Sequence, residues 1–319
     1  MDEPRRIIKF GKSSHVVSLP KEWMEKNKLK KGELVYLEYL KNKLVLSPKA
    51  QDYAEEEKKI VIDTKNMTMK SIRREILSSY ANNFNYMEIA GDFSKIQLEE
   101  IKEIIGGLVG MEIVDSNKSK VTAKDYLDMR AIELDKVIRR IDNTIRSMFE
   151  ELRNGLEEKT FKKARFDDIY KADETLNSLF FLVCKLAKKG LRDNEITKVM
   201  KTNPEELSSY HWIVMNFENI GDEIKRLARY LNETKLSDTD RKKLHNLCEE
   251  IESIYLILMS AIYNKNRVSA RDIMESKKNM IDKCRLFCKS KENSSIIRIT
   301  ERLENISVLM HNISRLILY

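Results

Sequence analysis

The segment KFGKSSHVVSLPKEW, from Lys9 to Trp23, combines a glycine, lysines and small hydroxyls, which are residue types that suit contact with phosphate. A Walker A loop also ends in Gly-Lys-Ser, but it needs another glycine five positions earlier, and Arg6 stands there. It also needs a helix that begins at the serine, whereas the β-branched run HVVSLP follows and closes at Pro20. The sequence therefore argues against a nucleotide pocket at this loop.

Basic residues surround the same glycine turn. A strand from Arg5 to Phe10 would place alternate side chains, those of Arg5, Ile7 and Lys9, on one face. Several cations and small hydroxyls on a tight hairpin can grip a nucleic-acid backbone. The sequence predicts DNA contact through Arg5, Arg6, Lys9, Lys12 and Ser13.

The distribution of charge supports this interpretation. The chain of 319 residues carries a net charge of +8, and residues 1–49 hold 12 Lys and Arg against 6 Asp and Glu. Most of the excess positive charge therefore lies in the first sixth of the chain, which points to a polyanion contact there. General solubility is the alternative explanation for such an excess.

A second set of candidate groups lies far along the chain. Glu218 and Asp222 are one helical turn apart, so both carboxylates share a helix face and could supply oxygen ligands to a metal ion. The alternative is a solvated face on which Lys225 and Arg226 are ion-pair partners. Cys284 and Cys288 are also one turn apart, but no His or second Cys pair lies nearby in sequence, which favours buried thiols over zinc.

No catalytic set follows from order or spacing. The four histidines are scattered at positions 15, 211, 245 and 311, and no Ser/His/Asp or Cys/His arrangement can be argued from them. A ferritin-type metal enzyme would need Glu-x-x-His pairs, and the sequence has none. We therefore expect a protein that is not an enzyme.

Glycine and proline usage indicates which elements must position these groups. Three of the four prolines and six of the nine glycines precede residue 111, whereas only one proline follows residue 124. Short strands and turns are expected in the first part and long helices in the second. The fold class is therefore multidomain, with three regions: a small β domain at 1–49, a small α/β module at 50–125 and an all-α region at 126–319.

The order of strands and helices can be predicted for the first two regions. Residues 4–48 predict two short strands, a short helix ended by Gly32, and a hairpin that turns at Lys41-Asn42. Residues 59–125 predict strand, helix, strand, helix and a closing hairpin formed by MEIVDS and KVTAK.

The third region has a helical apolar period to its end. Expected helices are 126–158, 161–190, 204–232, 237–265, 269–289 and 294–318. FENIGDEIKRLARYL from Phe217 and LENISVLMHNISRLI from Leu303 share ENI, and Arg229 aligns with Arg315. This match supports two three-helix repeats, at about 126–232 and 237–319.

The N-terminal region resembles the AbrB/SpoVT/MazE swapped-hairpin domains. The resemblance rests on the order strand, glycine turn, strand ending in Leu-Pro, short helix, Leu-x-x-Gly-Asp/Glu and hairpin, with Leu19-Pro20, Leu29 and Gly32-Glu33 as landmarks. It implies a homodimer of interleaved hairpins that binds DNA through the basic N-terminal strands and loop. A region that serves only for dimerisation remains the alternative.

The context NFENIGDEIKRLA resembles the ERIGDHxxNIA helix of PhoU, whose fold is two three-helix repeats. In that family such carboxylates face a groove and can hold transition-metal ions, and Asp173 matches the Asp of the preceding helix. The resemblance implies either no cofactor or a divalent or ferric ion at Asp173, Glu218 and Asp222. The second repeat departs from the pattern, because Glu304 matches the Glu but Val308 and Lys277 replace the two Asp, so no metal is expected there.

Together these features predict a cytoplasmic, homodimeric regulator. No stretch reaches the ~20 apolar residues of a membrane span, the N-terminus lacks a signal core, and the four cysteines form no CxxC pair. The PhoU resemblance implies a role in phosphate uptake and homeostasis, and the AbrB resemblance implies DNA as partner and transcription regulation. The alternative is a non-DNA adaptor that dimerises through its N-terminal region and restrains a phosphate ABC transporter ATPase or a signalling protein by contact.

Overall fold

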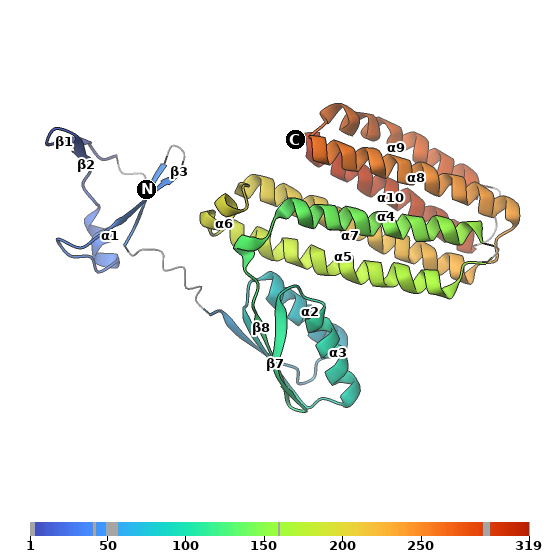
Figure 1. The fold of residues 1–319 in the computed structure, drawn as a ribbon, viewed down its shortest axis with the longest axis horizontal. Helices are drawn as coiled ribbons and strands as arrows, with labels where there is room; N and C mark the ends of the chain where they lie inside the picture. The colour runs from blue at the N-terminus through green and yellow to red at the C-terminus, as the bar shows by residue number, and fades with distance from the viewer. Residues whose placement is uncertain (1–3, 41–42, 49–56, 159, 290–293, 319) are drawn as a thin grey trace. The chain divides into compact units, whose positions relative to one another are not determined.

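The computed structural model describes residues 4–40, 43–48, 57–158, 160–289 and 294–318 of the chain. The chain divides into two compact units, residues 1–56 and residues 57–319, which we call the head and the body (Figure 1). The first sequence boundary, at residue 49, thus lies seven residues before the end of the head.

The head consists of two separate antiparallel hairpins and one short helix. Its elements are β1 (Ile8–Phe10), β2 (Ser14–Val16), α1 (Lys21–Lys26), β3 (Tyr36–Leu40) and β4 (Lys43–Ser47), and β1 pairs with β2 and β3 with β4. This order agrees with the expectation from sequence. The first strand is shorter than expected, because it begins at Ile8 and not at Arg5. The expected turn at Lys41-Asn42 lies outside the described residues.

The head leaves its apolar residues uncovered. None of its residues whose burial the structure describes is buried. Phe10 is 68%, Leu34 75% and Tyr39 78% exposed. Two short hairpins and a six-residue helix are too small to enclose a core of their own.

The body begins with an α/β module whose elements follow the expected order. They are β5 (Lys59–Asp63), α2 (Met69–Ala81), β6 (Tyr86–Ala90), α3 (Lys95–Gly106), β7 (Met111–Asn117) and β8 (Lys120–Asp125). The sheet order is β5-β6-β8-β7, with β5 parallel to β6 and the other pairs antiparallel. Thr68 and Ser94 cap the two helices, and Ser94 forms a capping box with Gln97.

The two helices of the module cover one face of its sheet. Met87 and Ile89 of β6 are fully buried together with Ile76 of α2 and Ile101 of α3. Val61 of β5 is 64% exposed, which is consistent with the opposite face of the sheet being open.

The remainder of the body is helical. Its elements are η1 (Met129–Ala131), α4 (Leu134–Glu157), α5 (Lys163–Gly190), α6 (Asn194–Val199), α7 (Pro204–Glu233), α8 (Asp238–Asn264), α9 (Arg267–Cys288) and α10 (Ser294–Leu318). The six long helices expected from sequence are therefore confirmed, mostly to within a few residues at each end.

Two details differ from the expectation for the helices. The first long helix begins at Leu134 and not at 126, because the Asp128 side chain accepts a hydrogen bond from the Arg130 amide at 2.9 Å and starts a 3-10 turn instead. The short helix α6 was not expected. It precedes Asn203, which caps α7 ahead of Pro204 at the first helical turn.

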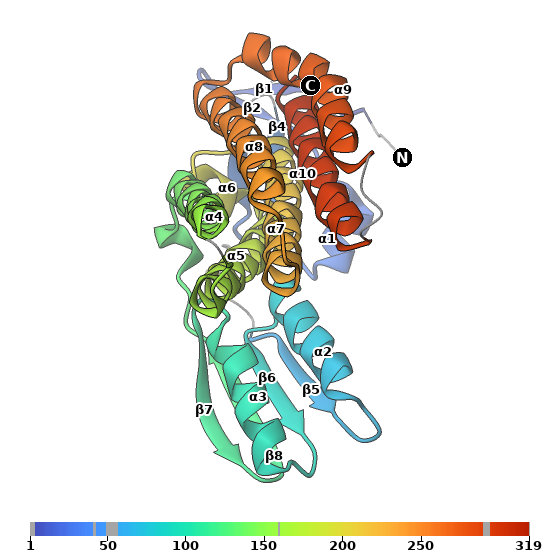
Figure 2. The same cartoon turned by 90° about the vertical axis from the view of Figure 1, so that its right-hand side faces the viewer.

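The long helices pack as two groups of three. Helices α4, α5 and α7 contact one another, as do α8, α9 and α10, and the groups meet along α7–α10 and α4–α8 (Figure 2). One continuous core runs through both groups and includes Phe149, Phe217 and Tyr255. Among the described residues, no helix is both long and apolar enough to cross a membrane.

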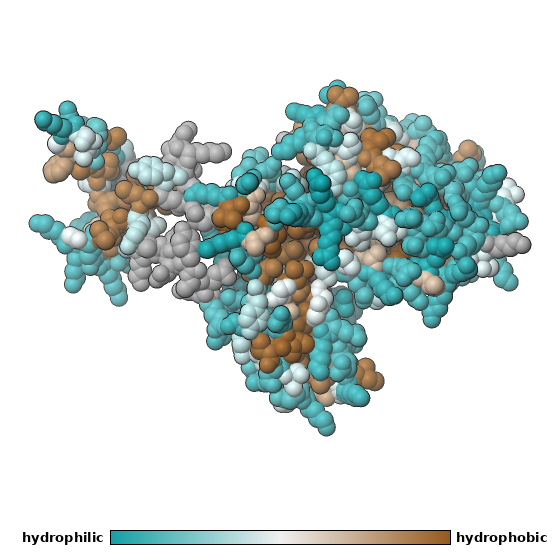
Figure 3. All heavy atoms as spheres, viewed as in Figure 1, coloured by the Kyte–Doolittle hydropathy of each residue, from teal (hydrophilic) through white to brown (hydrophobic). Residues whose placement is uncertain are grey.

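The α/β module is fastened to the helices by a buried lysine. Lys185 of α5 is fully buried, its Nζ lies 2.6 Å from Asp125 Oδ2 at the end of β8, and it stands 4.4 Å from the centre of the Tyr80 ring. The Asn83 side chain donates to the Lys185 carbonyl at 3.1 Å. Figure 3 shows apolar surface continuing from the helices onto the module. The boundary expected near residue 125 thus separates two architectures inside one compact unit.

Candidate functional site

The first candidate site is the β1–β2 hairpin of the head. Lys9 lies opposite His15 in the ladder, while Ile8 pairs with Val16 and Phe10 with Ser14. Because strand residues alternate between faces, Lys9 and His15 share one face and the apolar side chains of β1 lie on the other. The hairpin is therefore two-sided, with a basic face and an apolar face.

The turn of this hairpin is set by Gly11. Its φ is +70°, a left-handed conformation that other residues rarely adopt, and no atom lies within 4 Å of the position that a Cβ would take. Lys12 and Ser13 follow in the turn, and both are exposed. The turn therefore presents a cation, a hydroxyl and free space around the backbone, which is the chemistry that a phosphate chain needs.

The same geometry bears on the Walker A interpretation. Ser14 begins strand β2, and the next helix, α1, begins only at Lys21 after Pro20. The loop thus lacks the helix N-terminus with which a P-loop holds phosphate. The sequence argument against a nucleotide pocket here agrees with the geometry.

The five predicted DNA-contact residues are not all held in the same way. Lys9 belongs to β1 and Lys12 and Ser13 to its turn, so the hairpin brings these three together. Arg5 and Arg6 precede the strand, so the alternation expected to align Arg5 with Lys9 does not extend to them.

The second candidate site is the carboxylate group between α5 and α7. Lys225 lies between two aspartates, with its Nζ 2.5 Å from Asp173 Oδ2 and 2.8 Å from Asp222 Oδ1. Arg226 donates to Asp222 Oδ2 at 2.8 Å and to Glu223 Oε1 at 2.6 Å. The ion-pair alternative is therefore what the structure shows. The α7 face is partly solvated, since 25% of the Asp222 side chain is exposed, whereas Asp173 on α5 is buried.

The charges in this group shift the pKa values of its members. Burial acts to lower the pKa of Lys225, but its bonds to Asp173 and Asp222 outweigh that effect and raise it. Burial raises the pKa of Asp173, against the opposing effect of Lys225. Burial, reinforced by the negative charges of Asp222 and Asp173, raises the pKa of Glu218 to about 7. Glu218 is therefore the member of the group that changes charge near neutral pH.

The predicted metal ligands, as they stand, do not fit a metal ion. An ammonium group within hydrogen-bond distance of Asp173 and Asp222 repels a cation and uses their lone pairs, and Asn177 donates to the same Asp173 oxygen at 3.2 Å. Within the described residues, no group of three or more His, Cys, Asp and Glu side chains is placed to hold a metal ion.

Two buried carboxylates that the sequence analysis did not single out connect the helix groups. Glu223 of α7 contacts Arg302 of α10 at 3.1 Å. Asp142 of α4 accepts hydrogen bonds from Tyr255 at 3.1 Å and Tyr263 at 3.0 Å, both on α8. The only local signal for these contacts is the spacing of Asp142 and Arg146, one helical turn apart, which allows an ion pair. Their contacts tie helices together and expose no reactive group, so we regard them as structural.

Three of the thiols are also structural, and of the pair expected to be buried, Cys284 is buried while Cys288 is half-buried. Cys184, Cys248 and Cys284 are buried, and burial raises the pKa of the Cys184 thiol to about 11 and that of Cys284 to about 12. Cys184 Sγ lies 3.5 Å from His211 Nδ1, but burial lowers the pKa of His211, so the pair is neutral at pH 7 and offers no thiolate.

Comparison with known proteins identifies one part of the chain. Residues 8–54 match the family model of MazE, described as antidote-toxin recognition and bacterial antitoxin. This match covers the head and supports its assignment as a MazE/AbrB-type domain. No curated protein and no solved structure matched the chain.

Proposed function

We propose that this chain is a homodimeric DNA-binding regulator that contacts DNA through the β1–β2 hairpin of its head. The observation that carries the proposal is the two-sided hairpin, which has Lys9, Lys12 and Ser13 on a domain of the MazE/AbrB type. Domains of this type typically dimerise and bind DNA.

Dimerisation follows from the uncovered apolar face of the head. Ile8 and Phe10 of β1 and Leu37 of β3 are each more than half exposed in the single chain. A second head, with hairpins interleaved, would bury these side chains and bring two basic hairpin tips side by side. A two-fold pair of tips would then meet a DNA duplex at two places on its backbone.

Electrostatics favour a nucleic acid as the ligand of these tips. The first 49 residues carry a net charge of +6, and each phosphate neutralised by a lysine or arginine releases counterions, which drives binding. Lys12 and Ser13 stand at the turn, where nothing on the described part of the head covers them.

For the body we propose a role in phosphate homeostasis. The packing of α4, α5 and α7 and of α8, α9 and α10 supports a PhoU-like arrangement, together with the resemblance of NFENIGDEIKRLA. In this proposal the body binds a signal or partner, and its state alters DNA binding by the head.

The test compares two full-length double variants in DNA retention over a range of salt concentrations. Lys9→Ala/Lys12→Ala removes two hairpin cations, and Lys21→Ala/Lys26→Ala removes the same charge from α1. We expect the first variant to lower the log-log salt slope by roughly two units, about one for each phosphate contact, and the second to leave it near that of the wild type. Equal loss in both variants would show a non-specific charge effect.

The molecules that co-purify with the full-length protein distinguish the DNA-binding function from the adaptor alternative. Genomic fragments that co-purify with the protein should include DNA upstream of phosphate-transporter genes. If the wild-type chain retains no DNA at low salt, and a phosphate-transporter ATPase co-purifies instead, the adaptor function holds and the DNA proposal fails. If DNA is retained but no phosphate genes are enriched, the DNA proposal stands and the phosphate role fails.

A further inference from the structure

In each group of helices, a positive side chain contacts a carboxylate that the PhoU resemblance marks as a metal-ligand position. In the first group of helices the charge comes from Lys225, and in the second group from Arg285. The two arrangements are built from different residues on different helices, so each is an independent observation.

In the first group, Lys225 is fixed on three sides. Its Nζ contacts Asp173 of α5 at 2.5 Å and Asp222 of α7 at 2.8 Å, and it lies 6.0 Å from the centre of the Tyr170 ring. Its side chain is 15% exposed and that of Asp173 is 5% exposed. A lysine held so closely, with little contact with water, is a constant feature of the site rather than a mobile surface charge.

The position of the ammonium matches the position that a metal would need. Asp173 comes from one helix and Asp222 from the next, and a shared cation has to lie between their oxygens, which is where Nζ lies. Lys225 is three residues after Asp222 on α7, so its stem returns along the same helix face and brings the charge back to the carboxylate. Arg226 takes the second oxygen of Asp222, and the carboxylate has no oxygen left without a cation.

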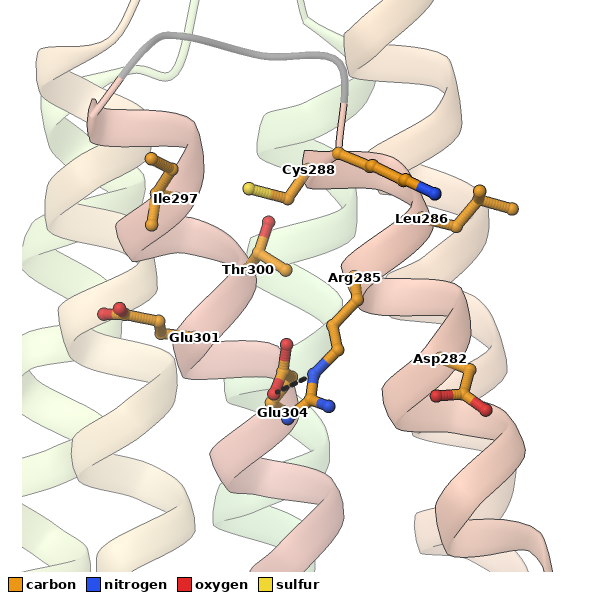
Figure 4. A pocket seen from close by; sticks show the side chains of 9 residues that line it. Asp282, Arg285, Leu286, Cys288, Ile297, Thr300, Glu301 and Glu304 are labelled. Carbon is orange, nitrogen blue, oxygen red and sulfur yellow. Dashed lines mark hydrogen bonds and ion pairs between the residues drawn. The ribbon is translucent and has the colours of Figure 1, made fainter.

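In the second group, Arg285 pairs with a single carboxylate, and its side chain is 67% exposed. Figure 4 shows a pocket between α9 and α10 in which Arg285 points at Glu304, and Arg285 Nε lies 3.4 Å from Glu304 Oε2. Glu304 is the residue that aligns with Glu218, and Val308, one turn later, carries no ligand atom. Lys277 aligns with Asp173, so this position adds a further positive charge in place of a carboxylate.

We propose that Lys225 permanently replaces a metal ion between Asp173 and Asp222, and that the body is therefore a metal-independent form of this helical fold. The lysine joins α5 to α7 through charge, as a bound ion would, but it cannot be removed by a chelator or by metal starvation. Whatever signal the body responds to, it does not enter as a metal at these carboxylates. This inference rests on the proposed PhoU-like arrangement of the body and is independent of the DNA-binding proposal.

The experiment measures metal binding by the full-length chain. Wild type and the variants Lys225→Ala, Lys225→Ala/Asp173→Asn and Arg285→Ala are loaded with Mn²⁺ or Zn²⁺ and desalted, and their metal content and Mn²⁺ affinity are compared. We expect the wild type to retain no more metal than the Arg285→Ala control, in whose second group Lys277 and Val308 stand at the positions aligned with Asp173 and Asp222. Lys225→Ala should bind Mn²⁺ on the order of a hundredfold more tightly, because a fixed positive charge has been removed from between the ligands. The gain should disappear in Lys225→Ala/Asp173→Asn.

Each other outcome counts against the proposal. Metal retained by the wild type well above the Arg285→Ala control would show that the lysine does not exclude the ion. No gain in Lys225→Ala would show that the ammonium does not hold the place of a metal. A gain in Arg285→Ala as large as that in Lys225→Ala would show that loss of any positive charge raises metal binding, and not specifically loss of the one between Asp173 and Asp222. If far-UV circular dichroism shows that Lys225→Ala is unfolded, Lys225→Gln, which keeps most of the side-chain length without the charge, takes its place.

Discussion

Gly221 of α7 lies so close to Leu176 of α5 that a Cβ atom on the glycine would stand 2.3 Å from Leu176 Cδ2. Both residues are fully or nearly buried, and the contact lies one residue before Asp222. The Leu176 side chain therefore packs directly on the α7 backbone, at the level where Asp173 of α5 and Asp222 of α7 contact one lysine.

Gly221→Ala should therefore destabilise the body. The added methyl group forces Leu176 or the helix to move, and overpacking of this kind costs about 1–3 kcal/mol. The matched control is Gly106→Ala in α3, where no atom lies within 4 Å of the new Cβ. That change should be neutral or stabilise by up to about 1 kcal/mol. Urea unfolding followed by circular dichroism gives both values, and equal effects at the two glycines would contradict this account.

Removing one partner of the buried Lys185–Asp125 pair should destabilise the body strongly. Lys185→Met leaves Asp125 without a charge partner at a site where the lysine is fully buried, and such changes cost roughly 3–5 kcal/mol. The double variant Lys185→Met/Asp125→Asn removes both charges and should recover part of that loss. The free energy of unfolding of the single and double variants checks this, and a double variant less stable than Lys185→Met would refute it.

Glu218 should make stability depend on pH near neutrality. Its pKa is raised from its ordinary value of 4.5 to about 7 in the folded chain, so the folded state binds the proton more tightly than the unfolded state does. The wild type therefore loses stability as the pH rises from about 4.5 to 7, by about 1–3 kcal/mol. Glu218→Gln, which cannot ionise, should remove this loss and be more stable than the wild type at pH 8.

The comparison for Glu218 needs a control for net charge. Glu174→Gln removes a carboxyl from an exposed position on α5 and serves that purpose. Free energies of unfolding at pH 5 and pH 8 separate the two variants. The account fails if Glu218→Gln gains no more stability between these two pH values than Glu174→Gln does.

Phe10→Asp should convert the dimer into monomers. A charge on the apolar face of β1, where Phe10 is 68% exposed in the single chain, cannot be buried against a second head without a large desolvation cost. Ile96→Asp is the matched control, because Ile96 is 80% exposed but lies on α3 of the body. Light scattering coupled to size exclusion reports the mass, and a dimer that survives Phe10→Asp would argue that the head is not the dimer contact.

Local signals made much of the fold predictable. Turns and element ends in the head fall at Gly11, Pro20 and Gly32. The order of the elements between them followed from turn and strand preferences alone. The helical period after residue 126 and the scarcity of glycine and proline there identified all six long helices. The start of α4 was wrong by eight residues, because the Asp128 turn competes with a helix that the apolar pattern alone would extend.

The candidate site was less predictable, because its chemistry depends on distant residues. The sequence placed Lys225 near Glu218 and Asp222, but it left open whether the lysine faced them or water. Its contact with Asp173 spans 52 residues, and no local pattern encodes it. Lys185 in CKLAKKG looks like one of several surface lysines, and only its position opposite Asp125 and Tyr80 accounts for its complete burial.

Because the head leaves its apolar residues uncovered, the amount of dimer depends on the concentration of the chain itself. If the apolar face of β1 is covered only by a second copy, the concentration of paired heads rises with the square of chain concentration when the chain is dilute. Doubling synthesis would then raise the dimer about fourfold, and occupancy of a DNA site would rise more steeply than expression. A protein built in this way responds to its own abundance before any effector is considered.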